Sequence, residues 1–380
     1  MSDEKALLAA IWAHPHEDTP RLMYADWLDE HGQSERAEFI RVQIEAERQR
    51  DNPSWTQFGE RAKQLLEAHE AEWIEPFGWI SLGGKTKVYV SEPTPDGWGG
   101  SVELNWIDPN PSDMGDVAPC YERGVEFHRG FPRAVRLEPP ALLTVPTPGQ
   151  PAGPRPTLFV KWEQQWPDRQ WPINNWAAVS TGLRSGWFAN WFFTNFNYEC
   201  GWVRPLIADS ETARGVIGLH IEGDGHTEPD EAEMTRLFSN APILEDVLLK
   251  SPRWTPNLLR ALGSTHLGRL LRLDYDGTWS EHSAGSALRA MCEAGPWPQL
   301  VGLTLHGLEG VGQDVVQLIR PDTFAALKRL AFWDRGGTRE FFSALLACPY
   351  LAHVQCIEYW GREAALEQLR DESCGRFVYK

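Results

Sequence analysis

A short apolar pattern recurs six times in the C-terminal part of the chain, between Val216 and Glu358. In each copy two residues separate the first apolar position from the second, and one residue separates the second from the third. The middle positions lie 24 to 32 residues apart, so the copies form a nearly regular repeat. The six copies are Val216-Leu219-Ile221, Leu244-Val247-Leu249, Gly268-Leu271-Leu273, Leu300-Leu303-Leu305, Leu327-Leu330-Phe332 and Leu351-Val354-Cys356.

This spacing matches the L-x-x-L-x-L motif of leucine-rich repeats, whose period is about 20–29 residues. Segments with helical patterns lie between the copies, at residues 231–238, 286–292, 315–319 and 338–347. Alternation of strand and helix at this period predicts a parallel sheet on the inside of a solenoid and helices on its outside. We therefore predict an α/β fold with a leucine-rich-repeat-like solenoid over residues 211–380.

The first 78 residues predict a small all-helical domain with a helical extension. Pro20 suits the first turn of a helix, and Gly32 suits the position just after its end. The strings TPRLMYADWLDEHG (19–32) and ERAEFIR (35–41) resemble the short repeat-companion domain of planctomycete bacteria, and FHRGF (127–131) resembles the segment that joins that domain to its repeats. The resemblance implies a bacterial protein in which this domain precedes a repeat array, often a leucine-rich one. It implies no activity.

The middle of the chain is predicted to be irregular. Residues 79–138 form a β-rich connecting region, with alternating patterns at 86–90 and 101–106 that are typical of strands. Residues 139–210 are predicted to be a proline-rich linker followed by a tryptophan-rich insertion. Degenerate repeats are an alternative for this segment. We favour the insertion because seven prolines at 139–156 are too many for the interior of a sheet or helix.

Aromatic residues are concentrated in the insertion: seven of the nineteen tryptophans lie between residues 159 and 202. They form a carbohydrate- or peptide-binding platform if their rings are exposed, and an irregular core if they are buried. We favour the core because clustered aromatic residues are usually buried. The candidate platform residues are Trp166, Trp171, Trp187 and Trp191.

The composition restricts the partners and the compartment. The net charge of −17 and the lack of a basic run disfavour nucleic acid and acidic membrane surfaces as partners. None of the six cysteines forms a C-x-x-C motif, so we expect free thiols in a reducing cytoplasm. The N-terminus has no apolar signal sequence, and no apolar run is long enough to span a membrane. We predict a soluble, cytoplasmic protein of undetermined oligomeric state.

Catalytic and cofactor motifs are missing from the sequence: it has no phosphate-binding loop, dinucleotide fingerprint, H-E-x-x-H or G-x-S-x-G. His14, His16, Glu17 and Asp18 are metal-ligand types, but a polar loop that caps a helix explains them better. Asp274 and its neighbours match only part of a calcium loop. We therefore predict no enzymatic activity, no cofactor and no metal.

The best candidate residues follow from the repeat geometry. Residues that alternate with the inward apolar positions point out of the sheet. Solenoids use their concave face for recognition, so we predict that this face binds another protein. The predicted binding residues are His220, Glu222, Asp246, Lys250, Arg272, Asp274, His306, Arg329, Trp333 and His353.

Overall fold

The structure is a computed structural model that divides into two compact units. The first comprises Met1–Lys161 and Ala177–Asn190, and the second comprises Trp162–Trp176 and Trp191–Lys380. The residues that the structure describes are 3–14, 17–49, 55–73, 75, 89–90, 124–137, 142–143, 145, 155–161, 171–197, 206, 208–222, 231–250, 256–266, 270–276, 284–306, 316, 318–333, 338–360 and 377–379.

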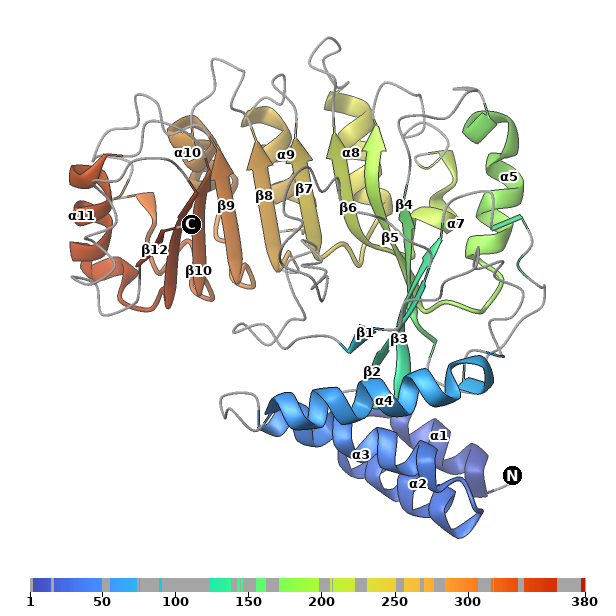
Figure 1. Ribbon diagram of the computed structural model, residues 1–380. Helices are drawn as coiled ribbons and strands as arrows, with labels where there is room; N and C mark the ends of the chain where they lie inside the picture. Colours follow the sequence, from blue (N-terminus) through green and yellow to red (C-terminus); the bar gives the residue numbers. More distant parts are fainter. Residues whose placement is uncertain are drawn as a thin grey trace, which may run out of the picture. The chain divides into compact units, whose positions relative to one another are not determined.

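The first unit begins with four helices, drawn in blue in Figure 1. Helix α2 has Pro20 in its first turn and ends before Gly32, whose φ of 77° is favourable for glycine. The next N–H, of Gln33, donates to the Leu28 carbonyl at 2.9 Å, which closes the end of the helix. The predicted helical character and the stop at Gly32 are confirmed. The helices are α1 (Asp3–Ala13), α2 (Thr19–Glu30), α3 (Ser34–Arg48) and α4 (Trp55–Trp73).

An apolar core joins α1, α2 and α3. Its fully buried members include Ile11 of α1, Ala25 of α2 and Ile40 of α3. Their neighbours in each helix recur at helical spacing, which places them on the same buried face. Phe131, which lies far along the chain, is also a member of this core and is only 5% exposed.

Four short strands belong to the first unit among the residues that the structure describes. Strands β2 and β3 form an antiparallel hairpin whose two turn residues, Arg129 and Gly130, have φ angles of 48° and 83°. Positive φ at both central positions is typical of a type I′ turn, whose twist matches that of the strands. Strand β3 then pairs in parallel with β4, with Val135 opposite Leu158, and β1 pairs in parallel with β2. The strands are β1 (Tyr89–Val90), β2 (Gly124–His128), β3 (Phe131–Leu137) and β4 (Thr157–Lys161).

Eight strands form a parallel sheet in the second unit, among the residues that the structure describes. They are β5 (Asn190–Asn197), β6 (Val216–Glu222), β7 (Asp246–Lys250), β8 (Arg272–Asp276), β9 (Gly302–His306), β10 (Arg329–Trp333), β11 (Cys356–Trp360) and β12 (Phe377–Tyr379).

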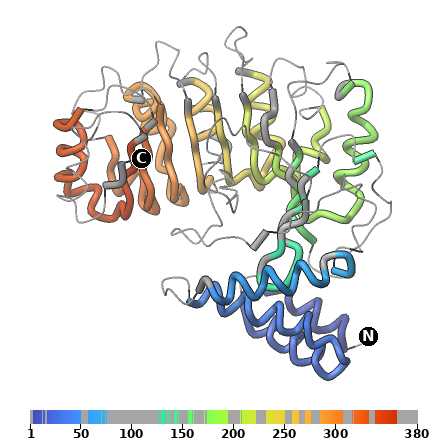
Figure 2. The backbone as a smooth tube through the Cα atoms, in the orientation of Figure 1, coloured from blue at the N-terminus to red at the C-terminus, as the bar shows by residue number. Residues whose placement is uncertain are grey.

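Described helices lie between β5 and β6, β6 and β7, β7 and β8, β8 and β9, and β10 and β11, and this alternation can be followed in Figure 2. They are α7 (Ser210–Ala213), α8 (Glu231–Asn240), α9 (Pro256–His266), α10 (Ala284–Ala294), α11 (Arg339–Ala347) and the 3-10 helix η6 (Pro349–Leu351). Helix α5 (Trp171–Leu183) contributes residues to both units.

Alternate residues of each repeat strand are buried. In β9, Leu303 and Leu305 are buried, whereas the three residues that alternate with them are partly exposed. Helices α8 to α11 bury apolar side chains such as Phe238, Leu262 and Leu345, and they lie on one side of the sheet (Figure 1). The predicted α/β, leucine-rich-repeat-like solenoid with a parallel sheet is confirmed.

The strand registers correct two of the six predicted repeat copies. The third copy is Leu270-Leu273-Tyr275, two residues later than predicted, because Leu273 lies opposite Val247. The sixth copy is Val354-Ile357-Tyr359, three residues later, because Ile357 lies opposite Leu330. The middle positions are then 219, 247, 273, 303, 330 and 357, which are 28, 26, 30, 27 and 27 residues apart. The true repeat is therefore more regular than the sequence indicated.

Both corrections have one physical cause. The third inward position is a tyrosine in these two copies, and Tyr275 and Tyr359 are both 0% exposed. The motif is defined by aliphatic residues, so nearby leucine, valine and cysteine residues gave competing matches in the sequence.

Other predictions concern the middle of the chain. Within residues 139–210, predicted to be a linker and an insertion, the structure places β4, α5 and β5. Most of the proline-rich stretch and the predicted strand at 101–106 lie outside the described residues. The cysteines that the structure describes, Cys292, Cys348 and Cys356, are free thiols. No helix in the described part of the chain combines the length and the apolar character needed to cross a bilayer.

Candidate functional site

One face of the second unit's sheet is turned away from helices α8 to α11 (Figure 1). We call it the helix-free face and define it by the positions of β6 to β11 that alternate with the buried ones. Its described positions are Gly218, His220, Asp246, Leu248, Arg272, Asp274, Gly302, Thr304, His306, Arg329, Ala331, Cys356 and Glu358.

Nine of the ten predicted binding residues lie at positions of this face. Cross-strand pairing arranges them in rows: Asp246 lies opposite Arg272, for example, and Glu222 lies opposite Lys250. The two-residue error in the third copy did not matter for Arg272 and Asp274, because side chains on a strand alternate with a period of two. The nine are His220, Glu222, Asp246, Lys250, Arg272, Asp274, His306, Arg329 and Trp333. The side chains of Glu222, Lys250 and Trp333 lie outside the described set, so only their strand positions are known.

His353 was wrongly placed on this face. Strand β11 begins only at Cys356, and His353 lies in the turn before it, with Nε2 3.1 Å from the Phe324 carbonyl oxygen. The predicted register was three residues early, and an odd shift exchanges the two faces of a strand. Cys356 and Glu358 therefore occupy helix-free positions of β11, although Cys356 was predicted to point inward.

Acid–base pairs bridge neighbouring strands across the helix-free face. His220 Nε2 of β6 lies 3.5 Å from Asp246 Oδ1 of β7. His306 Nε2 of β9 lies 3.1 Å from Asp274 Oδ1 of β8. The side chains of both pairs are only 14% to 32% exposed, so each group is held in a fixed orientation and is partly removed from solvent.

The third pair is the most buried and was not foreseen. The Arg329 guanidinium of β10 donates two hydrogen bonds to the Glu358 carboxylate of β11, at 3.0 and 2.9 Å. The Glu358 side chain is 9% exposed, so its charge needs compensation, and the two hydrogen bonds from Arg329 contribute it. The sequence signal for this position of Glu358 was that it lies between two apolar residues, Ile357 and Tyr359. The signal identifies a helix-free position only when Ile357 and Tyr359 are recognised as the inward residues of the repeat.

The aromatic strand β5 belongs to the same sheet and pairs with β6. The Phe192 ring meets the His220 ring edge-on, with centroids 4.8 Å apart. A Cβ at Gly218 would collide with the Phe192 ring, so this close approach requires glycine. Phe192 is 5% exposed and packs as part of the core at this end of the sheet.

The candidate platform residues are divided by the structure. Trp191 is 6% exposed, and its ring lies so close to Gly215 that no Cβ fits there. Trp171 and Trp187 are partly exposed, and Trp166 lies outside the described residues. The four tryptophans therefore do not share one environment, and Trp191 belongs to the core.

Comparison with known proteins gives a weak structural likeness. No family model matches the chain, and no curated protein matches it. Among solved structures, the chain is similar to the leucine-rich repeat-containing protein LegL7 from Legionella pneumophila. The TM-score is 0.35 at 8% sequence identity, over 63% of this chain and 98% of that one. The repeat fold described above rests on the strand registers and not on this likeness.

Proposed function

We propose that the helix-free face binds another protein and that the chain is a non-enzymatic interaction module. The observation that supports this proposal is the set of three acid–base pairs, which bridge β6 to β7, β8 to β9 and β10 to β11. Paired side chains with fixed orientation present a defined pattern of charge, and such patterns select partners and orient them. The repeat fold supports it too, because solenoids commonly use this surface for binding.

The rest of the chain is consistent with this role. We infer from the resemblance at residues 19–41 that the helical part is a repeat-companion domain of a bacterial protein. The net charge of −17 favours a protein partner over nucleic acid or an acidic membrane, and we place the protein in the cytoplasm. In the described part of the chain, no three metal-ligating side chains gather.

A carbohydrate or peptide site at the aromatic segment is the alternative. It is supported by the partial exposure of Trp171 and Trp187, and the burial of Trp191 counts against it. Replacing Trp171 and Trp187 by alanine separates the two proposals, because only the alternative requires these rings for binding.

The test of the main proposal compares two acid–base pairs. In one variant Asp274→Asn and His306→Gln remove the pair between β8 and β9. In the control, Arg260→Gln and Glu293→Gln remove an exposed pair between α9 and α10, whose nitrogen–oxygen distance is 2.5 Å. Partners are captured on the wild-type chain, identified by quantitative mass spectrometry and then measured in purified form.

We expect the face variant to weaken the partner's affinity by about tenfold or more, and the helix variant to leave it unchanged. A partner that binds both variants as tightly as the wild type contradicts the proposal.

A further inference from the structure

A stripe of side chains on α3 contacts the turn of the β2–β3 hairpin. Arg36, Ile40, Gln43 and Glu47 follow one another at intervals of four, three and four residues, so they lie on one face of the helix. Each of them contacts Arg129 or Gly130. The contacts join parts of the chain that are 82 to 94 residues apart in sequence.

The stripe binds both polar backbone groups of Gly130. The Gly130 N–H donates to Gln43 Oε1, and the Gly130 carbonyl accepts from Arg36 Nη2. A Cβ at Gly130 would collide with Ile40 Cγ1, so this close contact requires glycine at position 130. The positive φ of 83° sets the same requirement independently.

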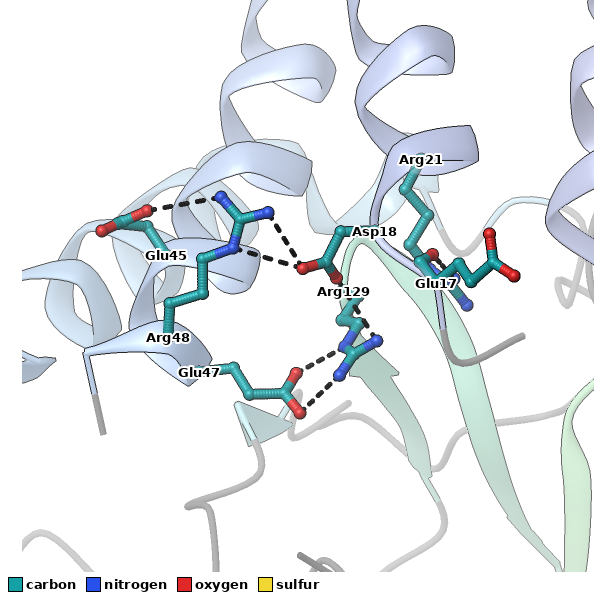
Figure 3. Close-up of polar contacts among 7 residues, drawn as sticks. All are labelled: Glu17, Asp18, Arg21, Glu45, Glu47, Arg48 and Arg129. Carbon is teal, nitrogen blue, oxygen red and sulfur yellow. Dashed lines mark hydrogen bonds and ion pairs between the residues drawn. The ribbon is translucent and has the colours of Figure 1, made fainter. Parts of the chain in front are cut away.

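The Arg129 side chain is bound as specifically as the glycine. Its guanidinium donates two hydrogen bonds to Glu47, at 2.5 and 2.6 Å, and lies 3.3 Å from Asp18 Oδ1. Figure 3 shows that Arg48 approaches Asp18 from the other side, where its nearest nitrogen is 3.1 Å from Oδ2. Asp18 is therefore bound by two arginines, Arg129 and Arg48. Arg48 also contacts Glu45.

Arg129 is present although its backbone disfavours it. It is the non-glycine residue with positive φ among those that the structure describes, and asparagine, aspartate or glycine is more common at this turn position. The two carboxylate partners of the Arg129 side chain, Glu47 and Asp18, offset the cost of this backbone conformation.

Two phenylalanines flank the turn and are bound as well. Phe127 is fully buried, with its ring 5.8 Å from that of Phe39 and the Arg36 guanidinium 5.3 Å from its centroid. Phe131 packs on Tyr24 at 5.8 Å, between the centroids of the two rings, and lies beneath Arg21. The helices therefore contact four of the five residues of the segment Phe127–Phe131 with side-chain or backbone specificity.

We propose that helices α1 to α4 form a binding module for a β-hairpin turn of the type Phe-x-Arg-Gly-Phe, which binds such a turn from a separate polypeptide when substitutions weaken the binding of the chain's own turn. All the recognised groups belong to five consecutive residues, and none of the contacts depends on how that segment is linked to α3. The module lies in the first unit and is independent of the function proposed for the helix-free face. In the intact chain the linked turn occupies the site at high effective concentration and excludes a competitor.

The probe is a head-to-tail cyclised, fluorescein-labelled peptide of residues 124–137, because cyclisation preorganises the hairpin. It is titrated against the full-length chain carrying Arg129→Ala and Gly130→Ala, and binding is followed by fluorescence anisotropy. Matched control peptides carry either Arg129→Ala or Gly130→Ala. We expect the variant chain to bind the native peptide at least about tenfold more tightly than it binds either control peptide, and at least about tenfold more tightly than the wild-type chain does.

The proposal is overturned if the variant keeps its helical circular dichroism but does not bind the native peptide, or binds the control peptides equally well. If the variant instead loses helix, the native peptide at saturating concentration is expected to restore it. Failure to restore the helix, or equal restoration by the control peptides, overturns the proposal as well.

Discussion

Two arginine–glutamate pairs with the same bidentate geometry have different surroundings in the two units. Arg329 and Glu358 lie on adjacent repeat strands, 29 residues apart in sequence. Arg129 and Glu47 join a hairpin turn to a helix across 82 residues. In both pairs the arginine Nε and one Nη donate to the two carboxylate oxygens.

The two pairs differ in how many neighbouring contacts stabilise the same part of the fold. The repeat pair is one of three on the helix-free face, and each repeat is also held by its own ladder and inward residues, so its loss is spread over neighbours. The hairpin pair belongs to one turn, on which the contacts of α3 converge. Closing so long a loop has an entropic cost, and the described contacts of α3 that offset it are concentrated on this turn. The turn is therefore expected to be the more sensitive of the two regions.

The largest expected effect is at Gly130. Gly130→Ala combines positive φ with a collision against Ile40, and we expect the free energy of unfolding of the first unit to fall by about 3–4 kcal/mol. The matched control is Gly32→Ala, where φ is 77° but no atom lies within 4 Å of the new Cβ. It should lose only about 1–2 kcal/mol. Urea denaturation measures both values, and equal losses would show that Ile40 gives way without cost.

The next effect is at Arg329. Arg329→Gln removes the bidentate hydrogen bonds to the Glu358 carboxylate, whose side chain is 9% exposed, and we expect a loss of about 3 kcal/mol in the second unit. Arg260→Gln removes an exposed pair with Glu293, in which the two side chains are 43% and 59% exposed, and should cost about 0.5 kcal/mol. Hydrogen exchange read by mass spectrometry locates each change. A loss at Arg329 no greater than that at Arg260 would place the repeat pair among ordinary surface pairs.

These two regions also differ in how far the sequence predicted them. The period and the strand–helix alternation were visible because the repeats present the same spacing several times. The register of single copies was less certain, since Tyr275 and Tyr359 take positions that the motif assigns to aliphatic residues. A register error of two residues kept Asp274 on its correct face, whereas an error of three residues wrongly placed His353 on the helix-free face.

The pairs themselves could not be predicted from the sequence. Each lies on a diagonal between strands, and a diagonal neighbour is known only when the register of both strands is known. The contact between the hairpin turn and α3 was even less predictable from the sequence. The stripe of α3 and the string 127–131 were both readable, but nothing in the intervening sequence indicated that Gln43 binds a backbone 87 residues away.

Two glycines of the repeat sheet provide a comparison within one unit. Gly218→Ala should cost about 2 kcal/mol because the new Cβ collides with the buried Phe192 ring. Gly302→Ala should stabilise by about 0.5 kcal/mol, because its Cβ makes an ordinary contact, 3.7 Å from Arg272 Cγ, and the unfolded chain loses freedom. Thermal melts of the two variants measure the difference, and a destabilising Gly302→Ala would contradict the open geometry at β9.

The smallest effect depends on pH and is confined to the helical region. Burial, followed by the nearby Glu4 carboxylate, raises the pKa of Tyr24 from 10.0 to about 12. Since the folded state holds the phenol proton more tightly, this contribution is fully present below pH 10 and is lost as the pH rises through about 12. The wild type should therefore lose about 1 kcal/mol more than Tyr24→Phe over that interval, a value reduced for partial solvent screening. Tyr350→Phe, at a ring that is 49% exposed, is the control. Urea titrations at pH 9 and at pH 11.5 give the comparison, and parallel losses in wild type and Tyr24→Phe would mean that the buried hydroxyl does not couple folding to pH.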